Sequence, residues 1–207
     1  MLLLTSRVDE PNRVDGRPPE HIAAGPVVLR RVRLADAEAI ADAVAESMEH
    51  LQQWLAWATP EMADAAEQRA RILEADTLWE TGTDFIFSLL RPVGHPDERL
   101  PSAGVLGAIG LHRRIGPGAI EMGYWVHAAH AGRGYATAAA RALTCAALAL
   151  PGVHRVEIHC DVVNAASAAI PRRLGYRLDR VQEREPHAVA ETGRCIIWVL
   201  EYPASSG

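Results

Sequence analysis

The 207-residue sequence contains no lysine, so all 21 of its Lys+Arg residues are arginine. This absence excludes mechanisms that need a lysine: a Schiff base, a Ser-Lys dyad and the phosphate loop of the Walker type. Arginine is therefore the only permanently cationic side chain available to bind a phosphate, and the chain's only primary amine is its own N-terminus. Asparagine is nearly as scarce, whereas alanine occurs 36 times, a bias typical of a GC-rich genome.

Cysteines and long hydrophobic runs are also few. Three scattered cysteines are too few for a disulfide framework, which favours a reducing, cytoplasmic location. The longest apolar stretch, 138–150, is interrupted by Arg141 and is too short to span a bilayer. The first residues turn polar at Arg7 and lack the apolar core of a signal peptide. We therefore expect a cytoplasmic protein with no membrane partner.

The composition is that of an ordinary globular chain with one domain. Hydrophobic residues make up 49% of the chain and charged residues 23%. A net charge of -5 and a pI near 6.0 argue against a general nucleic-acid binder, although local basic sites for a small anion stay open. Proline, glycine and charges without periodicity predict an extended or poorly ordered arm at 1–25, before a domain at 26–203 and a tail at 204–207.

Periodicity and turn residues predict a mixed α/β sheet. The expected strands are 27–34, 85–90, 105–112, 119–127, 153–162, 176–185 and 194–202, and the expected helices lie near 37–44, 49–58, 61–81, 132–150 and 164–174, with a loop at 94–101. The order is β, three helices, βββ, α, β, α, ββ. The crossover from 119 to 162 predicts two parallel strands joined by the helix 132–150.

Two glycines, Gly132 and Gly134, lie where an expected strand ends and a helix begins. Without a Cβ they let the backbone approach a bound group, and the first N–H groups of the helix then suit a phosphate or pyrophosphate. A plain structural turn is an equal alternative at this point. The spacing matches neither Gly-x-Gly-x-x-Gly nor Walker A, which excludes a dinucleotide-binding or kinase motif.

A second segment begins at Asn164, which alone is more typical of a helix N-cap than of a functional residue. Pro171 lies in the middle of the same expected helix, where it should break or kink the hydrogen-bond ladder. Such a local conflict often marks a functional site.

Together these segments resemble the GNAT acetyltransferase superfamily, and within it the RimJ/RimL-like ribosomal-protein N-acetyltransferases. The glycine motif lies at 131–136, Asn-x-x-Ser at 164–167, Leu-Gly-Tyr at 174–176, Leu-x-x-Trp-x-x-Trp at 51–57 and Glu-Met-Gly-Tyr-Trp-Val at 121–126. The resemblance covers roughly 26–202, and the combined order is specific where each motif alone is weak. It implies the acyl-CoA N-acyltransferase fold, a central twisted mixed sheet flanked by helices.

The resemblance also implies an acetyl-CoA-dependent N-acetyltransferase acting on a primary amine, with a protein N-terminus such as that of a ribosomal protein as the first expectation. Two departures matter. Ala131 replaces the usual Gln or Arg of the motif, and Pro171 stands where many members have a catalytic tyrosine. Ser167 is then the candidate general acid, although it is equally typical of a helix start.

Glu121 is the candidate base for the amine, acting through water, against the alternative of a solvent-facing strand carboxylate. A backbone N–H near 125–127 would polarise the thioester carbonyl. The full set of cofactor-binding candidates is Trp125, Val126, His127, Ala131, Gly132, Arg133, Gly134, Tyr135, Ala136, Asn164, Ser167 and Arg173. Trp54, Trp57 and Tyr124 are candidates for the acceptor groove, although aromatic residues at helical spacing more often belong to a core.

Other functions stay open at this stage. One alternative is an acetyltransferase of a small amine such as an antibiotic or a metabolite, and another is a CoA-binding sensor without catalysis. The nine histidines show no recognised ligand spacing, so no metal is expected. A homodimer is common in the family, but no residue decides the oligomeric state.

Overall fold

The computed structural model describes residues 16–92 and 104–202. The loop expected at 94–101, the first fifteen residues of the expected arm and the tail at 204–207 lie outside these residues. In these two ranges, eight strands form one sheet in the order β1-β2-β3-β4-β5-β6-β8-β7. Their bounds are His21–Ala24 (β1), Val27–Arg31 (β2), Asp84–Leu90 (β3), Val105–His112 (β4), Ala119–Val126 (β5), Arg155–Asp161 (β6), Arg177–Glu183 (β7) and Arg194–Glu201 (β8).

Within the part of the chain that the structure describes, four α-helices and three short 3-10 helices join the strands. They are α1 (Ala37–Gln52), α2 (Ala65–Glu80), α3 (Tyr135–Leu148), α4 (Ala165–Arg173), η1 (Leu34–Asp36), η2 (Pro60–Ala63) and η3 (Ala128–His130). None of the helices within the described ranges is long and apolar enough to cross a membrane. The expected mixed α/β class is confirmed, since β5 and β6 pair in parallel around α3 while the other strand pairs are antiparallel.

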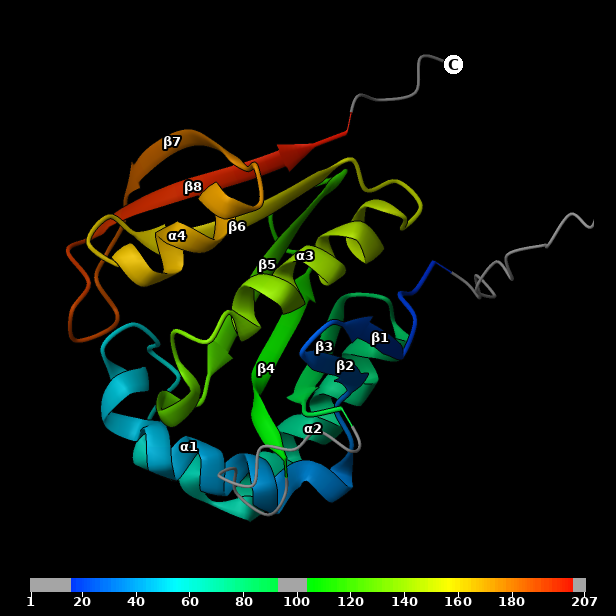
Figure 1. Cartoon of the computed structure of the whole chain (residues 1–207), viewed down its shortest axis with the longest axis vertical. Helices are drawn as coiled ribbons and strands as arrows, with labels where there is room; N and C mark the ends of the chain where they lie inside the picture. Colours follow the sequence, from blue (N-terminus) through cyan, green and yellow to red (C-terminus); the bar gives the residue numbers. More distant parts are fainter. Residues whose placement is uncertain (1–15, 93–103, 203–207) are drawn as a thin grey trace, which may run out of the picture.

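The parallel strands β5 and β6 separate soon after they meet. Their pairing runs only from Ala119 opposite Arg155 to Glu121 opposite Glu157. Beyond that point β5 stays on β4 as far as Val126, and β6 stays on β8 as far as Asp161. The sheet therefore opens between β5 and β6 in Figure 1, and it leaves backbone groups along both facing edges for another partner.

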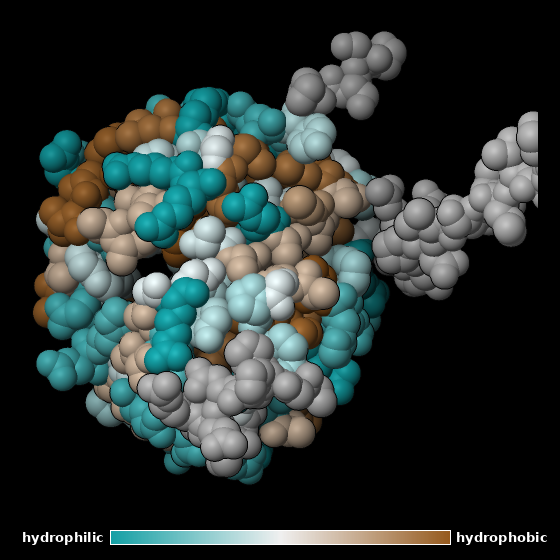
Figure 2. All heavy atoms as spheres, in the orientation of Figure 1, coloured by the Kyte–Doolittle hydropathy of each residue, from teal (hydrophilic) through white to brown (hydrophobic). Residues whose placement is uncertain are grey.

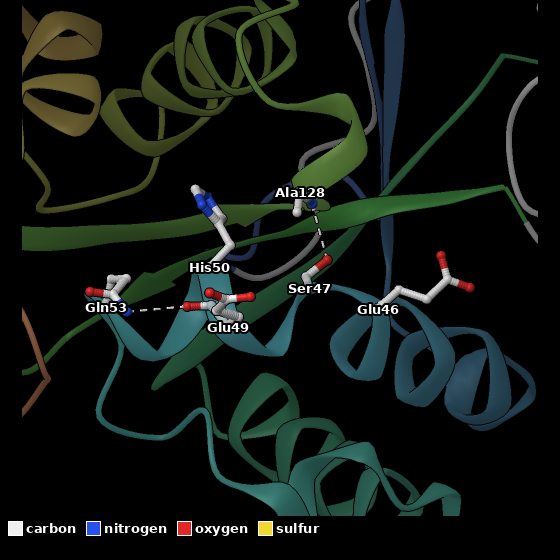
Figure 3. A pocket seen from close by; sticks show the side chains of 6 residues that line it. All are labelled: Glu46, Ser47, Glu49, His50, Gln53 and Ala128. Atoms are coloured by element: carbon white, nitrogen blue, oxygen red, sulfur yellow. Dashed lines mark hydrogen bonds between the residues drawn. The ribbon is translucent and has the colours of Figure 1, made fainter.

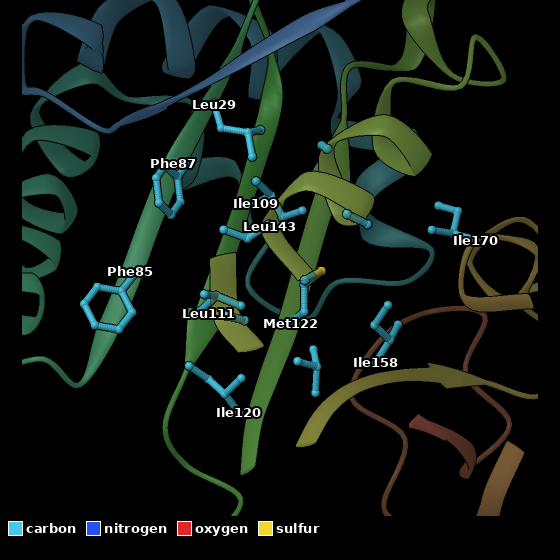
Figure 4. Packing of buried hydrophobic residues seen from close by; sticks show 14 of the residues in the cluster. Leu29, Phe85, Phe87, Ile109, Leu111, Ile120, Met122, Leu143, Ile158 and Ile170 are labelled. Atoms are coloured by element: carbon cyan, nitrogen blue, oxygen red, sulfur yellow. The ribbon is translucent and has the colours of Figure 1, made fainter. Parts of the chain in front are cut away.

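The helices cover both faces of this sheet. On one face α3 packs over the middle strands, and its buried alanines Ala139, Ala140 and Ala147 let it lie close to them. Figure 4 shows Phe85, Phe87, Leu111 and Ile120 in the core that forms there, and all four are fully buried. On the other face α1 and α2 bury a smaller cluster against β4, so the sheet is held rigidly from both sides.

Three expectations differ from the structure. The helix expected at 37–44 and the first part of the one expected at 49–58 form one continuous helix, α1, which ends at Gln52, so two long helices and not three precede β3. Pro60 begins the short η2, whereas α2 starts at Ala65, because the carboxylate of its N-cap Asp64 accepts the N–H groups of Ala66 and Glu67. The sheet also begins inside the segment assigned to the arm, since β1 pairs with β2.

Pro171 lies inside α4, which continues through it to Arg173. The expected break does not occur, because proline removes only one bond of the helical ladder, the one to the carbonyl of Ser167.

Candidate functional site

The glycine turn leads directly into α3. Gly132 and Gly134 have φ angles of 75° and 81°, a region that favours glycine, and a Cβ placed on either would meet nothing within 4 Å. Glycine is therefore required here by backbone conformation, and the space in front of the turn is open. Gly134 caps α3 without a side-chain acceptor, so the first N–H groups of the helix face that space.

The neighbouring side chains leave this turn accessible. Ala131 and Arg133 are exposed, while Tyr135 and Ala136 are half-buried in the first turn of α3. Arg173 is also exposed, on the last turn of α4. The backbone N–H groups of the turn do not depend on the side chain at position 131, so Ala131 in place of Gln or Arg leaves them unchanged.

The open edge of β5 supplies a further donor. The N–H of His127 donates to the carbonyl of Leu106 on the β4 side, at 2.9 Å. Since N–H groups alternate along a strand, those of Tyr124 and Val126 point the other way, toward the gap between β5 and β6. Of the expected donors near 125–127, the Val126 N–H is thus the one that faces the gap.

The His127 side chain fastens the end of β5 to α1. Its Nε2 lies 3.0 Å from a carboxylate oxygen of Glu46, and its Nδ1 accepts the N–H of Ala129 at 3.2 Å. Beside it, the Ala128 N–H donates to Ser47 Oγ at 3.0 Å. His127 is 2% exposed, so its ring acts as a fixed support of η3 and not as a surface group.

A hollow of about 400 Å³ lies where α1 meets η3. Its lining residues are Glu46, Ser47, Glu49, His50, Gln53 and Ala128. Glu46, Ser47, Glu49 and His50 come from the C-terminal half of α1 and Gln53 directly follows it, and Figure 3 shows Ser47 directed at the backbone of Ala128. The space-filling view in Figure 2 is hollowed on the same side, between α4 and the end of α1. The carboxylates of Glu46 and Glu49 make this hollow attractive to a cation.

Asn164 and Ser167 open α4. Asn164 is the N-cap, and its Oδ1 accepts the N–H of Ser167 at 3.0 Å, so the expectation of a capping role is confirmed. The amide N–H₂ of Asn164 is then the part of the side chain that can donate to a ligand. Ser167 Oγ lies 3.1 Å from the hydroxyl of Tyr124, which reaches it from β5.

Glu121 lies at the point where β5 and β6 part. Both of its carboxylate oxygens accept hydrogen bonds from Arg114, at 2.7 and 2.8 Å. Burial alone would raise the pKa of this carboxyl, but the Arg114 guanidinium and the charges of His159 and His112 hold it below its usual value. Each of these histidines contacts a carboxylate of its own. Glu121 is therefore ionised, and it belongs to a polar row that crosses the sheet.

The three aromatic candidates do not gather at one place. Trp57 packs edge-on against Trp125, with ring centroids 6.1 Å apart, in the cluster under α1 and α2. Tyr124 packs instead against the cluster under α3, on the opposite face of β5. Trp54 is half-buried in the turn that follows α1. The structure thus brings Trp57 to Trp125 and Tyr124 to Ser167.

Sequence reasoning missed the residues that hold the loop between β7 and β8. Asp161 is 2% exposed and accepts both the N–H and the hydroxyl of Thr192, at 2.8 and 3.0 Å. The same loop meets the end of α1, because the Val189 N–H donates to the carbonyl of Gln52 at 3.2 Å. In the sequence, the signal for this contact is an aspartate at the end of a hydrophobic strand, shortly before Asn164.

Among the described residues, no group of three or more histidine, cysteine, aspartate or glutamate side chains is placed to hold a metal ion. The candidate site consists of four parts: the glycine turn, the edge of β5, the start of α4 and the polar row that contains Glu121. These parts suit a long ligand with a phosphate at one end and a reactive carbonyl at the other, as acyltransferases that use acetyl-CoA require.

Comparison with known proteins agrees with this class. Residues 27–177 match the family described as acetyltransferase (GNAT) domain. The chain therefore belongs to the GNAT family, and it is an acetyl-CoA-dependent N-acetyltransferase. YdaF of Bacillus subtilis (strain 168), provisionally named a ribosomal N-acetyltransferase, is 29% identical over 153 residues, which are 72% of this chain and 77% of YdaF.

Solved structures show the same fold. RimL, a ribosomal L7/L12 α-N-protein acetyltransferase solved with coenzyme A, has a TM-score of 0.76 and 20% identity, over 88% of this chain and 98% of its own. The microcin C7 self-immunity acetyltransferase MccE, solved with acetyl-CoA and AMP, has a TM-score of 0.77 and 17% identity, over 89% and 97% of the two chains. The expected GNAT fold is thus confirmed.

Proposed function

We propose that this N-acetyltransferase acts on the α-amine of a protein N-terminus, with a ribosomal protein as the first candidate. The observation that carries the proposal is the opening between β5 and β6, which connects the glycine turn at one end with Glu121 at the other. The similarity to YdaF supports the ribosomal acceptor. The family fold alone does not determine the acceptor, because the loops that would contact it are the part of the chain that the fold determines least.

Groups of this chain are suited to bind the phosphates, the pantetheine arm and the thioester carbonyl of acetyl-CoA. The N–H groups of Gly134 and the first turn of α3 would hold the pyrophosphate, with Arg133 and Arg173 as exposed cations for further phosphate oxygens. The amide of Asn164 would bind the pantetheine arm. The Val126 N–H would donate to the thioester carbonyl, where negative charge develops during transfer.

Glu121 is proposed to take the proton of the amine through a water molecule. An α-amine has a reference pKa of about 7.7–8.0, so only one readily lost proton must be removed before the neutral nitrogen attacks. Ser167 is proposed to donate a hydrogen bond to the sulfur as the carbon–sulfur bond breaks and the electron pair moves to sulfur. Glu121 would then act on the amine nitrogen and Ser167 on the sulfur.

The acceptor is proposed to enter beside the end of α1. Glu46 and Glu49 line the hollow there, and they would attract an ammonium group or a basic N-terminal segment. The loop between β7 and β8 closes the other side, where it donates to the carbonyls of Gln52 and Gln53. An entrance bounded by the end of a helix and by a loop suits a flexible chain end better than a side chain on a folded surface.

The test is the release of free CoA from acetyl-CoA in the presence of defined acceptors. One panel contains peptides with free N-termini taken from ribosomal proteins, and a second contains the same peptides blocked at the N-terminus but carrying a lysine. A third contains small amines, including aminoglycosides. We expect turnover with the free N-termini alone and a mass increase of one acetyl group on the first residue.

Each other outcome selects a different function. Turnover with small amines but not peptides would replace the protein acceptor by a small molecule. Acetyl-CoA binding without turnover on any panel would indicate a sensor of acetyl-CoA, and the proposed reaction would be rejected.

A further inference from the structure

The hydroxyl of Tyr124 has no role in the reaction proposed above, yet it lies at the proposed leaving-group site. It is 3.1 Å from Ser167 Oγ and 3.3 Å from the backbone carbonyl oxygen of Ser167. The two residues come from different elements, β5 and α4, and are 43 positions apart. Tyr124 thus contacts both polar oxygens of the residue that is proposed to meet the departing sulfur.

Pro171 explains why the carbonyl of Ser167 accepts a side chain. In an α-helix this carbonyl would accept the N–H of the residue four positions later, which is position 171. Proline has no N–H, so the carbonyl loses its helical partner. The Tyr124 hydroxyl donates to this carbonyl instead. Proline at 171 and tyrosine at 124 are therefore parts of one arrangement.

We propose that Tyr124 is a positioning residue that holds the Ser167 hydroxyl toward the gap between β5 and β6. The inference rests on the proposed function, because it assumes that the sulfur of acetyl-CoA leaves at Ser167. It goes beyond that function by assigning the hydroxyl of Tyr124 a task in the chemical step.

The hydrogen bonds that Tyr124 and Ser167 can make depend on their two hydroxyl protons. Tyr124 and Ser167 carry one hydroxyl proton each. When Tyr124 donates to the Ser167 carbonyl, the Ser167 proton is directed at the oxygen of Tyr124. When Tyr124 turns to donate to Ser167 Oγ, the Ser167 proton is free to point at the sulfur. Rotation of two hydroxyl groups is enough to change between these states.

The transfer step is balanced without moving either of these protons. The amine nitrogen bonds to the acetyl carbon, the carbon–sulfur bond breaks, and the electron pair goes to sulfur. Glu121 has already taken, through water, the proton that the ammonium form loses before the attack, and the second proton, which the nitrogen loses as the amide forms, passes to water. Ser167 then stabilises the thiolate by a hydrogen bond and keeps its proton.

The surroundings keep Tyr124 protonated. Burial raises the pKa of Tyr124 above its ordinary value, so the phenol remains a hydrogen-bond donor and does not supply a proton. The Cys160 thiol on β6 also interacts with Ser167, and burial raises the pKa of that thiol, so it remains neutral beside the pair. Both neighbours of Ser167 are therefore uncharged.

Tyr124→Phe tests the inference because it removes the hydroxyl and keeps the ring. We expect kcat to fall about tenfold, with the Kd for acetyl-CoA unchanged, since a hydrogen bond that acts in the transition state is lost. Tyr176→Phe is the matched control. The Tyr176 hydroxyl is also buried and bonded, to Thr144 Oγ1 at 2.7 Å, but it lies in the core under α3. This control should leave kcat unchanged.

A double-mutant cycle separates positioning from a general structural effect. If Tyr124 acts through Ser167, then Tyr124→Phe should have no further effect on kcat in a Ser167→Ala background. An equal fall of kcat in both backgrounds, an equal fall in the Tyr176→Phe control, or no fall at all would overturn the inference. A wild-type protein that acetylates no amine would instead overturn the proposed function, and this inference with it.

Discussion

Arg114 holds both carboxylate oxygens of Glu121 across the β4–β5 hairpin. The two side chains differ in exposure, since that of Arg114 is 61% exposed and that of Glu121 only 13%. An exposed cation thus controls the protonation of a largely buried carboxylate. If Glu121 is the base, this pairing sets the lower pH limit of activity.

Arg114→Gln should therefore move the acid limb of the pH profile to higher pH. Arg114 lowers the pKa of Glu121 in the folded protein, so its removal raises that pKa, because only His159 and His112 then oppose the effect of burial. The active form is the carboxylate, and activity is lost as pH falls through the pKa. The measurement is kcat/KM from pH 4 to pH 9 for both proteins, and an unmoved acid limb would contradict the prediction.

Glu121→Gln tests the same carboxylate directly. We expect kcat/KM for the amine to fall about 100-fold, the usual scale of general base catalysis, while acetyl-CoA still binds. Glu183→Gln is the control, because Glu183 is a strand carboxylate on β7 with a side chain that is 79% exposed. Full activity of the Glu121 variant would show that the proton leaves by another group.

Gly134→Ala should weaken acetyl-CoA binding in addition to destabilising the fold. Alanine at a φ of 81° costs about 1–2 kcal/mol of stability, and its Cβ would stand in the open space before α3. We expect the Kd for acetyl-CoA to rise about tenfold or more, which corresponds to about 1.4 kcal/mol. Calorimetric titration measures this directly.

Gly152→Ala is the matched control for that experiment. Gly152 follows the other end of α3, has a φ of 73°, and likewise has nothing within 4 Å of an added Cβ. It carries the same backbone strain without facing the proposed ligand. The two variants should lose similar stability, and only Gly134→Ala should lose affinity; equal affinities would argue against a phosphate at the turn.

The local features of this fold could be predicted because neighbouring residues determine them. The strand β3 is nearly continuous apolar sequence, and the turn at Gly132 and Gly134 is visible in the residues themselves. The start of α2 is predicted at 61, directly after Pro60, whereas the helix begins at Ala65. The Asp64 side chain, which accepts the helical N–H groups, determines this start, and its position is a matter of three-dimensional geometry.

The contacts within the candidate site could not be predicted in this way. The pairing of Arg114 with Glu121 depends on the hairpin register, which places His112 opposite Glu121. The contact of Tyr124 with Ser167 depends on how far β5 and β6 separate, a property of the whole sheet. A sequence pattern named both residues of that pair as candidates but gave them unrelated roles. Their relation follows only from the arrangement of strand and helix.

Asp161→Asn should destabilise the loop between β7 and β8 in a pH-dependent manner. Hydrogen bonds from the backbone N–H groups of Val163 and Thr192, with the Thr192 hydroxyl, hold the pKa of Asp161 below its ordinary value although burial opposes this. Because the folded pKa is lowered, the carboxylate stabilises the fold above the unfolded pKa of about 3.9, and that stability is lost as pH falls through the folded pKa.

Thermal unfolding at a series of pH values measures this contribution. Wild type should exceed Asp161→Asn by about 1–3 kcal/mol near pH 7, and the difference should shrink below about pH 4 as the wild-type carboxyl becomes protonated. The loop also bounds the proposed acceptor entrance, through its bond to the carbonyl of Gln52. The variant should therefore raise KM for the amine while the Kd for acetyl-CoA stays the same. A difference in stability that is constant from pH 3 to pH 7 would show that the charge of Asp161 does not hold the loop.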